Sequence, residues 1–196
     1  MKQRCSMAVI LVCLGSLRMA AAMTTLVPPP FDSCVDFHCD ETRTVTLDSG
    51  HWQAVRGLFA GETSPAGERE RIRQAIALLE REVGMIIGTL SDMARNIKGA
   101  GYQLDCISES KNTTTYLQLL FNDGLLKWHE INERQVRYPL IFDTHWTAVI
   151  LDRNSGQRYA VDSWFLDNGE PPYIQPLEDW LSGRRIDRAV EHADHR

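Results

Sequence analysis

Three residues of the types that carry out thiol catalysis lie in the second half of this 196-residue chain. Cys106 follows a glycine-containing stretch, residues 99–104, and begins a segment with the pattern of a helix. His145 begins one apolar run, and Asp162 lies inside the next. In thiol catalysis a thiolate attacks a carbonyl carbon, an imidazole transfers the proton, and a carboxylate orients the imidazole. The order and the placement of these residues predict a Cys–His–Asp catalytic triad.

The position of Cys106 favours a reactive thiol over an inert one. Asp105 is of a type that caps helices, so a helix is expected to begin at Cys106. A helix start supplies unpaired N–H groups and a partial positive charge, and both lower the pKa of a thiol. Taken alone, each residue is more simply explained without catalysis, as a buried cysteine, an edge-strand histidine or a structural aspartate. It is their combination that favours catalysis. We expect an enzyme, and the alternative is a non-catalytic exported binding or interaction module that retains the fold.

The elements around these residues predict an α+β fold. Residues 68–97 form the longest helical pattern, and the helix that begins at Cys106 is expected to end at Asn122-Asp123-Gly124. Strand patterns cover residues 127–131, 135–138, 145–151 and 158–165. The apolar stripe of the long helix, which we expect to lie in the core, consists of Ile72, Ile76, Leu79, Val83, Ile86, Leu90 and Met93.

A polar turn, residues 152–157, joins the last two strand patterns as a hairpin. A register with His145 opposite Asp162 sets Leu151 opposite Gly156. The loop then has four residues, which is within the usual range for hairpins. In this register the histidine and the aspartate are neighbours on one face of the sheet.

Further residues are candidates for parts of the same site. The backbone N–H of Cys106 is a natural donor to an oxyanion, and Gln103, three residues upstream, is a candidate for a second donor. Trp164 is a candidate for the wall of the site. His129 competes with His145 for the role of base, but it lies in a polar, mixed stretch and ranks below it.

The cysteine pattern suits an oxidising compartment. Cys34 and Cys39 are five residues apart and are expected to form a local disulfide, which leaves Cys106 free. Together with Asp36 and His38 the two cysteines could instead bind a metal ion, but four well-spaced ligands are not evident. We therefore expect no metal site and no cofactor.

The first 22 residues have the pattern of a secretory signal peptide. A basic start is followed by an apolar run, residues 7–17, and by three alanines at the cleavage positions. The apolar run is short for a membrane span, although Arg18 leaves an uncleaved anchor as an alternative. We expect a periplasmic or secreted protein without stable membrane insertion after cleavage.

The domain organisation and the charge follow from this leader. We expect a signal peptide at 1–22, a linker with the local cysteine pair at 23–40, a catalytic domain at 41–183 and a mobile tail at 184–196. Removal of the leader takes away three basic residues and no acidic one, which leaves 18 basic and 26 acidic residues and a net charge of −8. Such a surface disfavours nucleic acid as a partner.

At the triad the chain resembles the transglutaminase-like branch of the papain-like superfamily, which includes the bacterial transglutaminase-like cysteine peptidases. The resemblance covers roughly residues 70–166, and the separations of 39 and 17 residues within the triad look usual for that family. The motifs that carry the resemblance are Asp105-Cys106 at a helix start, His145-Trp146 at a strand start and Val161-Asp162-Ser163-Trp164 on the next strand.

The resemblance implies a role for each residue of the triad. Cys106 would be the nucleophile, His145 the general base and acid, and Asp162 the group that orients the imidazole. The implied fold has N-terminal helices, with the cysteine-bearing helix packed on a small antiparallel sheet. The implied activity is that of a peptidase, amidase or transglutaminase-like enzyme, for which we expect a peptide, protein or cell-wall stem-peptide substrate.

Overall fold

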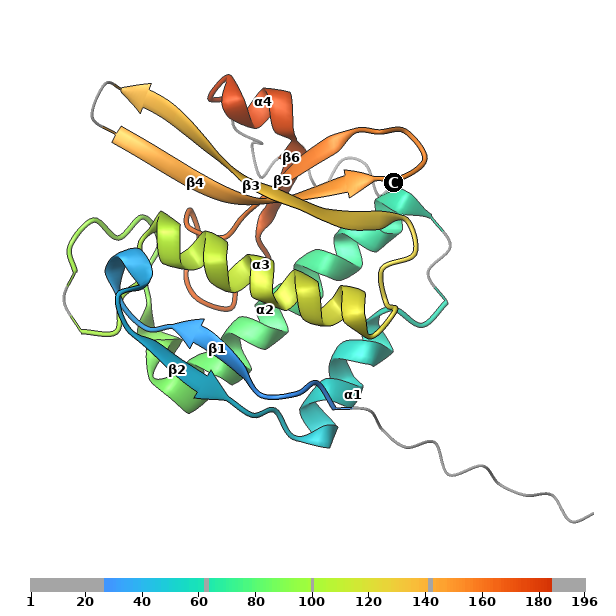
Figure 1. Cartoon of the computed structure of the whole chain (residues 1–196), viewed down its shortest axis with the longest axis horizontal. Coiled ribbons are helices and arrows are strands. Elements are labelled where there is room, and N and C mark those ends of the chain that lie inside the picture. The colour runs from blue at the N-terminus through green and yellow to red at the C-terminus, as the bar shows by residue number, and fades with distance from the viewer. Residues whose placement is uncertain (1–26, 62–63, 100, 141–142, 185–196) are drawn as a thin grey trace, which may run out of the picture.

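The cysteine-bearing helix lies between two antiparallel sheets in the computed structural model, which describes residues 27–61, 64–99, 101–140 and 143–184 (Figure 1). This arrangement confirms the predicted α+β class. The helices in the described part are α1 (Ser49–Leu58), α2 (Pro65–Ile87), α3 (Cys106–Asn122) and α4 (Leu177–Leu181). Short 3-10 turns occupy Phe37–Cys39 and Thr89–Ser91. The strands are β1 (Phe31–Cys34), β2 (Thr42–Val45), β3 (His129–Leu140), β4 (Asp143–Asp152), β5 (Arg158–Asp162) and β6 (Tyr173–Pro176).

The larger sheet is a four-stranded antiparallel meander in the order β3-β4-β5-β6. The strands expected at 127–131 and 135–138 belong to a single strand, β3. Its pairing with β4 shifts register between Asn132 and Gln135. The sheet is layered between helices, because α4 covers one face while α2 and α3 lie on the other (Figure 1).

The β4–β5 register differs by two residues from the expected one. Leu151 pairs with Arg158 rather than with Gly156. The turn is longer than expected because Gly156 belongs to it: its N–H donates to the carbonyl oxygen of Asp152 at 2.8 Å, and its φ is 71°. A shift of two residues keeps every side chain on its face of the sheet, so His145 and Asp162 remain on one face as diagonal neighbours.

Alternate residues of the central strands fill the two sides of the sheet. Ala148 and Ile150 of β4 join the main core with Leu117 of α3 and residues of α2. Val149, one residue away on β4, faces the other side and packs against α4, including Trp180. The parity of β4 therefore decides which residues meet α3 and which lie under α4.

Helix α3 begins at Cys106 as the sequence predicts. The carboxylate of Asp105 accepts a hydrogen bond from the backbone N–H of Ser108 at 2.9 Å, which is the usual contact of a helix-capping side chain. The helix ends at Asn122, and Gly124 follows with a φ of 70°. Tyr116, Leu117 and Leu120 form the buried face of the helix.

The long helix α2 ends ten residues earlier than expected. Gly88 adopts a left-handed φ of 97°, and its N–H bonds to the carbonyl oxygen of Gly84, so the chain leaves the helix there. Leu90 and Met93 therefore lie beyond the helix and are exposed, and Ile86, inside the helix, is exposed as well. The expectation that these three residues lie in the core is wrong. Ile72, Ile76, Leu79 and Val83 are buried as expected.

The segment expected as a linker contributes to the fold. Within 23–40, Phe31–Cys34 form β1 and pair with β2, and the next residue, Val35, is fully buried. Cys34 and Cys39 are joined by a disulfide, as the spacing predicts. The cysteine sulfurs of this loop are therefore not free to bind a metal ion.

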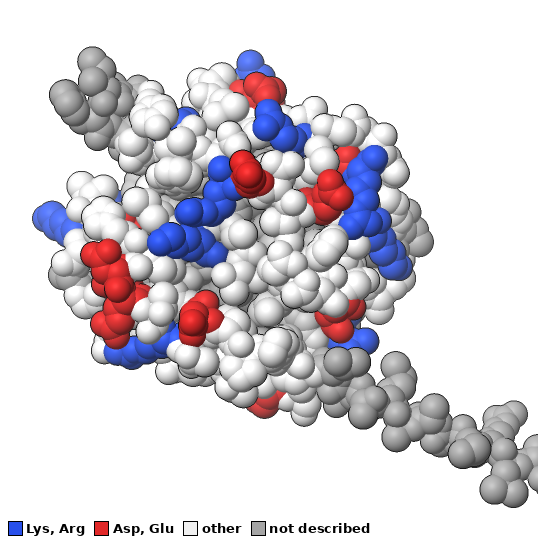
Figure 2. All heavy atoms as spheres, viewed as in Figure 1, with Lys and Arg blue, Asp and Glu red and all other residues white. Residues whose placement is uncertain are grey.

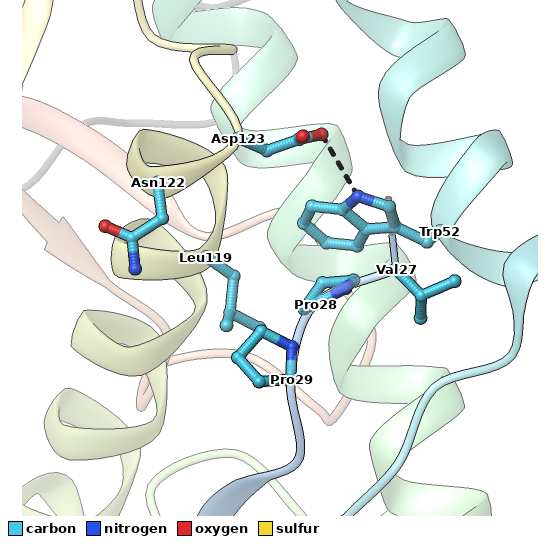
Figure 3. Close-up of a pocket in the computed structure, with 7 residues that line it drawn as sticks. All are labelled: Val27, Pro28, Pro29, Trp52, Leu119, Asn122 and Asp123. Atoms are coloured by element: carbon cyan, nitrogen blue, oxygen red, sulfur yellow. Dashed lines mark hydrogen bonds between the residues drawn. The ribbon is translucent and has the colours of Figure 1, made fainter. Parts of the chain in front are cut away.

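The start of the described chain packs near α1. Val27, Pro28 and Pro29 line a small hollow of about 90 Å³ beside Trp52, whose indole N–H donates to Asp123 at 3.1 Å (Figure 3). The hollow is far smaller than the usual ligand site of about 300–1,000 Å³.

Two of the expected segments fall outside the described residues, namely the signal peptide at 1–22 and nearly all of the tail at 184–196. None of the helices in the described part has the length and apolar character needed to cross a membrane. The face seen in Figure 2 carries basic and acidic side chains side by side, without a large patch of either sign.

Candidate active site

A cleft of about 630 Å³ opens beside the first residue of α3. Cys106, His145 and Trp164 all line it, so three segments far apart in the sequence meet there. Its volume falls within the range of small-molecule and peptide-side-chain sites. Three of the predicted site residues, Cys106, His145 and Trp164, therefore meet in this cleft.

The thiol of Cys106 lies against the main chain on both sides of His145. Its Sγ donates to the carbonyl oxygen of Thr144 at 3.6 Å, and the backbone N–H of Trp146 also contacts the sulfur. Cys106 is half-buried and takes no part in a disulfide. The cap at Asp105 and the edge of β4 thus hold the nucleophile candidate from two sides.

The environment raises the pKa of the Cys106 thiol to about 11. Burial is the largest cause, because it disfavours the charged form, and the carboxylates of Asp105 and Asp162 act in the same direction. The N–H groups of Trp146 and of Cys106 itself lower the pKa, but by less. In this arrangement the thiol is protonated at neutral pH, contrary to the expectation that the helix start would make it a thiolate.

The imidazole of His145 is held by Asp162. Its Nε2 lies 2.7 Å from Oδ2 of Asp162, and the indole N–H of Trp180 donates to the same oxygen at 2.7 Å. Three aromatic rings surround the imidazole, with centroids 4.8 Å (Trp164), 4.9 Å (Phe165) and 5.5 Å (Trp180) away. The position and the orientation of the imidazole ring are therefore fixed by one carboxylate and by three aromatic rings.

The second nitrogen of His145 is the one that could exchange a proton with a thiol. Nδ1 is buried and has no hydrogen-bond partner among the described residues. The thiol of Cys106 is bonded to Thr144 instead, so the structure brings the two groups into one cleft without a hydrogen bond between them.

Gln103 does not serve as an oxyanion donor in this structure. Its side-chain N–H donates to the carbonyl oxygen of Ser91 at 3.0 Å, and its oxygen accepts from Asn96 and from the backbone N–H of Met93. The amide joins the segment before α3 to the loop that follows α2 through these hydrogen bonds, and it does not line the cleft. The side chain has a structural task that the sequence did not reveal.

Of the other two candidates, Trp164 lies at the site and His129 does not. Trp164 lines the cleft and stacks beside His145, as expected of a wall residue, and its indole N–H donates to the carbonyl oxygen of Asn96 at 3.4 Å. His129 is completely buried, and its Nδ1 lies 2.9 Å from Glu68. Glu68 also accepts the backbone N–H groups at the start of β3, so His129 belongs to a structural network.

A cluster of buried carboxyl groups lies beneath α3, and sequence reasoning missed it. Glu109 of α3 hydrogen-bonds to Asp92, and Glu80 of α2 accepts the backbone N–H of Gly169 at 3.0 Å and contacts Ser163. Burial raises the pKa of Glu80 to about 7, and it raises the pKa of Asp92 and, strongly, that of Glu109. A usable signal existed, because Glu80 falls within the apolar stripe of α2.

Among the residues that the structure describes, no three His, Cys, Asp or Glu side chains are grouped so that they could hold a metal ion. The chemistry open to the cleft is therefore considered from the thiol, the imidazole and the surrounding N–H groups.

Comparisons of the chain with models of protein families, with curated proteins and with solved structures found no match in any of the three. The assignment of a function rests on the geometry of the cleft.

Proposed function

We propose that the protein is an exported, thiol-dependent acyl-transfer enzyme of the transglutaminase-like type, in which Cys106 is the nucleophile, His145 the base and acid, and Asp162 the orienting carboxylate. One observation carries the proposal. The only disulfide-free cysteine of the described part lies at a helix start in a cleft, against the main chain on both sides of a histidine that a buried aspartate holds.

The proposed reaction has two halves. His145 Nδ1 takes the proton of the thiol as sulfur attacks an amide or isopeptide carbonyl carbon, and a C–S bond forms. The protonated imidazole then gives its proton to the leaving amine, and the C–N bond breaks to leave a thioester on Cys106. Water or a second amine attacks the thioester carbonyl carbon while His145 accepts its proton. The C–S bond then breaks, and the imidazolium returns the proton to the sulfur, so that the Cys106 thiol and the neutral imidazole are restored. Asp162 stabilises the imidazolium at each stage.

The raised pKa of Cys106 sets a condition on this reaction. Since the resting thiol is protonated, the proposal uses His145 as a true general base and not as one half of a preformed ion pair. The thiol has to exchange its bond with the Thr144 carbonyl for one with Nδ1. Hydrogen bonds of this kind are often loose before substrate binds.

One oxyanion donor is proposed to be the backbone N–H of Cys106. As the first residue of α3, it has no intrahelical acceptor for this group. A developing negative charge there also benefits from the dipole of a 17-residue helix. Gln103 is not part of this proposal, because its amide is already bonded.

Export is proposed from two features that agree. The leader pattern at 1–22 favours secretion, and the Cys34–Cys39 disulfide requires an oxidising compartment in order to persist. A peptide, a protein or a cell-wall stem peptide is the proposed substrate class, because a cleft of about 630 Å³ accommodates side chains on each side of an amide.

The competing function is a non-catalytic exported binding module with the same fold. Two observations favour it: the thiol pKa of about 11, and the absence of a hydrogen bond to Nδ1 of His145 within the described residues. In that case the cleft binds a ligand, and Cys106 is a half-buried thiol without a chemical role.

The dependence of Cys106 alkylation on pH distinguishes the two functions. If His145 acts as base, iodoacetamide labels the wild-type thiol measurably below pH 8, and His145→Ala removes this limb of the rate profile. His145→Gln keeps more of the packing against Trp164 and serves as the second variant, and near-UV circular dichroism verifies folding. His51→Ala is the matched control, because His51 lies on α1 and pairs with Asp48 and Glu82. A single titration near pH 11 that is the same with and without His145 would leave only the binding module.

A further inference from the structure

We propose that Arg95 forms a carboxylate-binding subsite in the cleft, so that the substrate is a peptide with an acidic group close to the amide that reacts. This inference rests on the proposed function and specifies its substrate class. It draws on the backbone, the position and the charge of one arginine.

The backbone of Arg95 is held in an unfavourable conformation. Its φ is 56°, in the left-handed region that residues with a side chain seldom adopt. Its N–H donates to the carbonyl oxygen of Trp164 at 2.8 Å, and the indole of Trp164 donates to the carbonyl oxygen of Asn96. The cleft wall itself thus fixes the direction in which this loop residue points.

The guanidinium of Arg95 lies close to the reacting groups. Its central carbon is 5.3 Å from the centre of the Phe165 ring, which is 4.9 Å from the centre of the His145 ring. The guanidinium is therefore at most about 10 Å from the imidazole. An extended chain advances about 3.3–3.6 Å per residue, so this separation corresponds to about three residues of an extended peptide.

The guanidinium is also available to a ligand. Of the described residues, none offers Arg95 a carboxylate partner, whereas Arg43, Arg73 and Arg153 pair with acids. Arg95 is exposed at the rim of the cleft, and the contact that its guanidinium makes within the described part of the chain is with the face of Phe165. A planar guanidinium with unused N–H groups matches the geometry of a carboxylate.

The charged residues that line the cleft favour an anion. Among the described residues that line the cleft, two are arginines, Arg95 and Arg137, and one carries a carboxylate, Asp105, which lies 3.0 Å from the imidazole of His38. Arg137 is buried, and its guanidinium donates to the carbonyl oxygen of Trp180. The chain as a whole has a net charge of −5. Arg95 is the exposed one of these two arginines, so an anion that enters this cleft of an acidic protein meets a positive group there.

Alkylation with two reagents of the same size tests the subsite without knowledge of the substrate. Iodoacetate carries a carboxylate and iodoacetamide is neutral; with either reagent the Cys106 sulfur forms a bond to carbon as iodide leaves. Arg95→Gln is expected to lower the ratio of the iodoacetate rate to the iodoacetamide rate by roughly 2- to 15-fold, the range for two charges about 10 Å apart between full solvation and the effective dielectric near a protein surface. Added salt reduces the wild-type ratio in the same direction.

Arg153→Gln is the matched control, since Arg153 lies near Phe121 at the far end of α3 and does not line the cleft. An equal ratio in wild type, Arg95→Gln and Arg153→Gln would overturn the subsite and leave Arg95 as a support for Phe165. That outcome leaves the proposed function intact, because the His145-dependent limb of the iodoacetamide profile is measured separately. A different result would refute the enzyme and retain an anion-binding cleft. In that case the iodoacetamide profile of the wild type has no His145-dependent limb, while the ratio of the iodoacetate rate to the iodoacetamide rate still depends on Arg95.

Discussion

The unfolding free energy of the protein is expected to fall as the pH rises from 5 to 8, because the carboxyl group of Glu80 is buried. Its pKa is raised from 4.5 to about 7. Burial is the largest cause and the nearby Asp92 acts in the same direction, while Ser163, the N–H of Gly169 and the charge of Arg81 act against them. The folded state therefore binds a proton that the unfolded state releases above pH 4.5, so stability is lost as the pH increases. For Glu80 alone the loss between pH 5 and pH 8 is about 2–3 kcal/mol.

Glu80→Gln removes this contribution while it keeps the shape of the side chain. The amide oxygen can still accept the N–H of Gly169, and the amide nitrogen takes the place of Oε1, which has no hydrogen-bond partner among the described residues. We expect the variant to match the wild type near pH 5 and to be more stable by about 2–3 kcal/mol at pH 8. The remaining pH dependence belongs to Asp92 and Glu109.

Urea denaturation at pH 5, 6, 7 and 8, followed by tryptophan fluorescence, measures the effect. Glu178→Gln is the matched control, because Glu178 is 74% exposed and pairs only with the surface residue Arg158; its curve should follow the wild type within about 0.5 kcal/mol. A wild-type unfolding free energy that is constant or rises over this range would refute the reasoning. Parallel curves for wild type and Glu80→Gln would do so as well.

Two further substitutions test other parts of the structure. Asp162→Asn is expected to lower the unfolding free energy by roughly 1–3 kcal/mol, since one oxygen of Asp162 accepts from both His145 and Trp180. It should also lower the His145-dependent alkylation rate per folded molecule, and an unchanged rate would assign Asp162 a purely structural role. Gly84→Ala is expected to destabilise by about 1–3 kcal/mol, because its Cβ would lie 2.9 Å from the backbone nitrogen of Leu90. Gly57→Ala, with nothing within 4 Å, should be neutral or stabilising by up to about 1 kcal/mol in thermal denaturation.

Local signals in the sequence were reliable where one residue acts on its neighbours. Asp105 caps α3 because its carboxylate needs only the N–H three residues ahead, and the pair Cys34–Cys39 requires only a short loop. Period-two alternation placed His145 and Asp162 on the same face even though the register was shifted by two residues.

The predictions failed where contacts between distant parts of the chain determine the structure. Gly88 ends α2 because the chain turns there, although Leu90 and Met93 continue the apolar pattern on an exposed loop. Gln103 lies three residues before the cysteine in the sequence, a separation that suits an oxyanion donor, but its side-chain N–H donates to the carbonyl oxygen of Ser91. The raised pKa of Cys106 likewise depends on burial under β4, which no local pattern encodes.

The contacts of the Cys34–Cys39 loop connect the redox state of this disulfide to the shape of the cleft. Within this loop, the N–H of His38 donates to Asp105 at 3.1 Å and the carbonyl of Asp36 accepts from Ser108 at 2.5 Å, while Asn112 bonds to both backbone groups of Cys34. Oxidation of this loop therefore shapes the surface on which the first turns of α3 settle. These contacts reach the first turns of α3, whereas the four-stranded sheet and α2 lie elsewhere in the fold. Reduction of the disulfide is therefore expected to loosen the end of α3 that carries Cys106 before it affects the sheet.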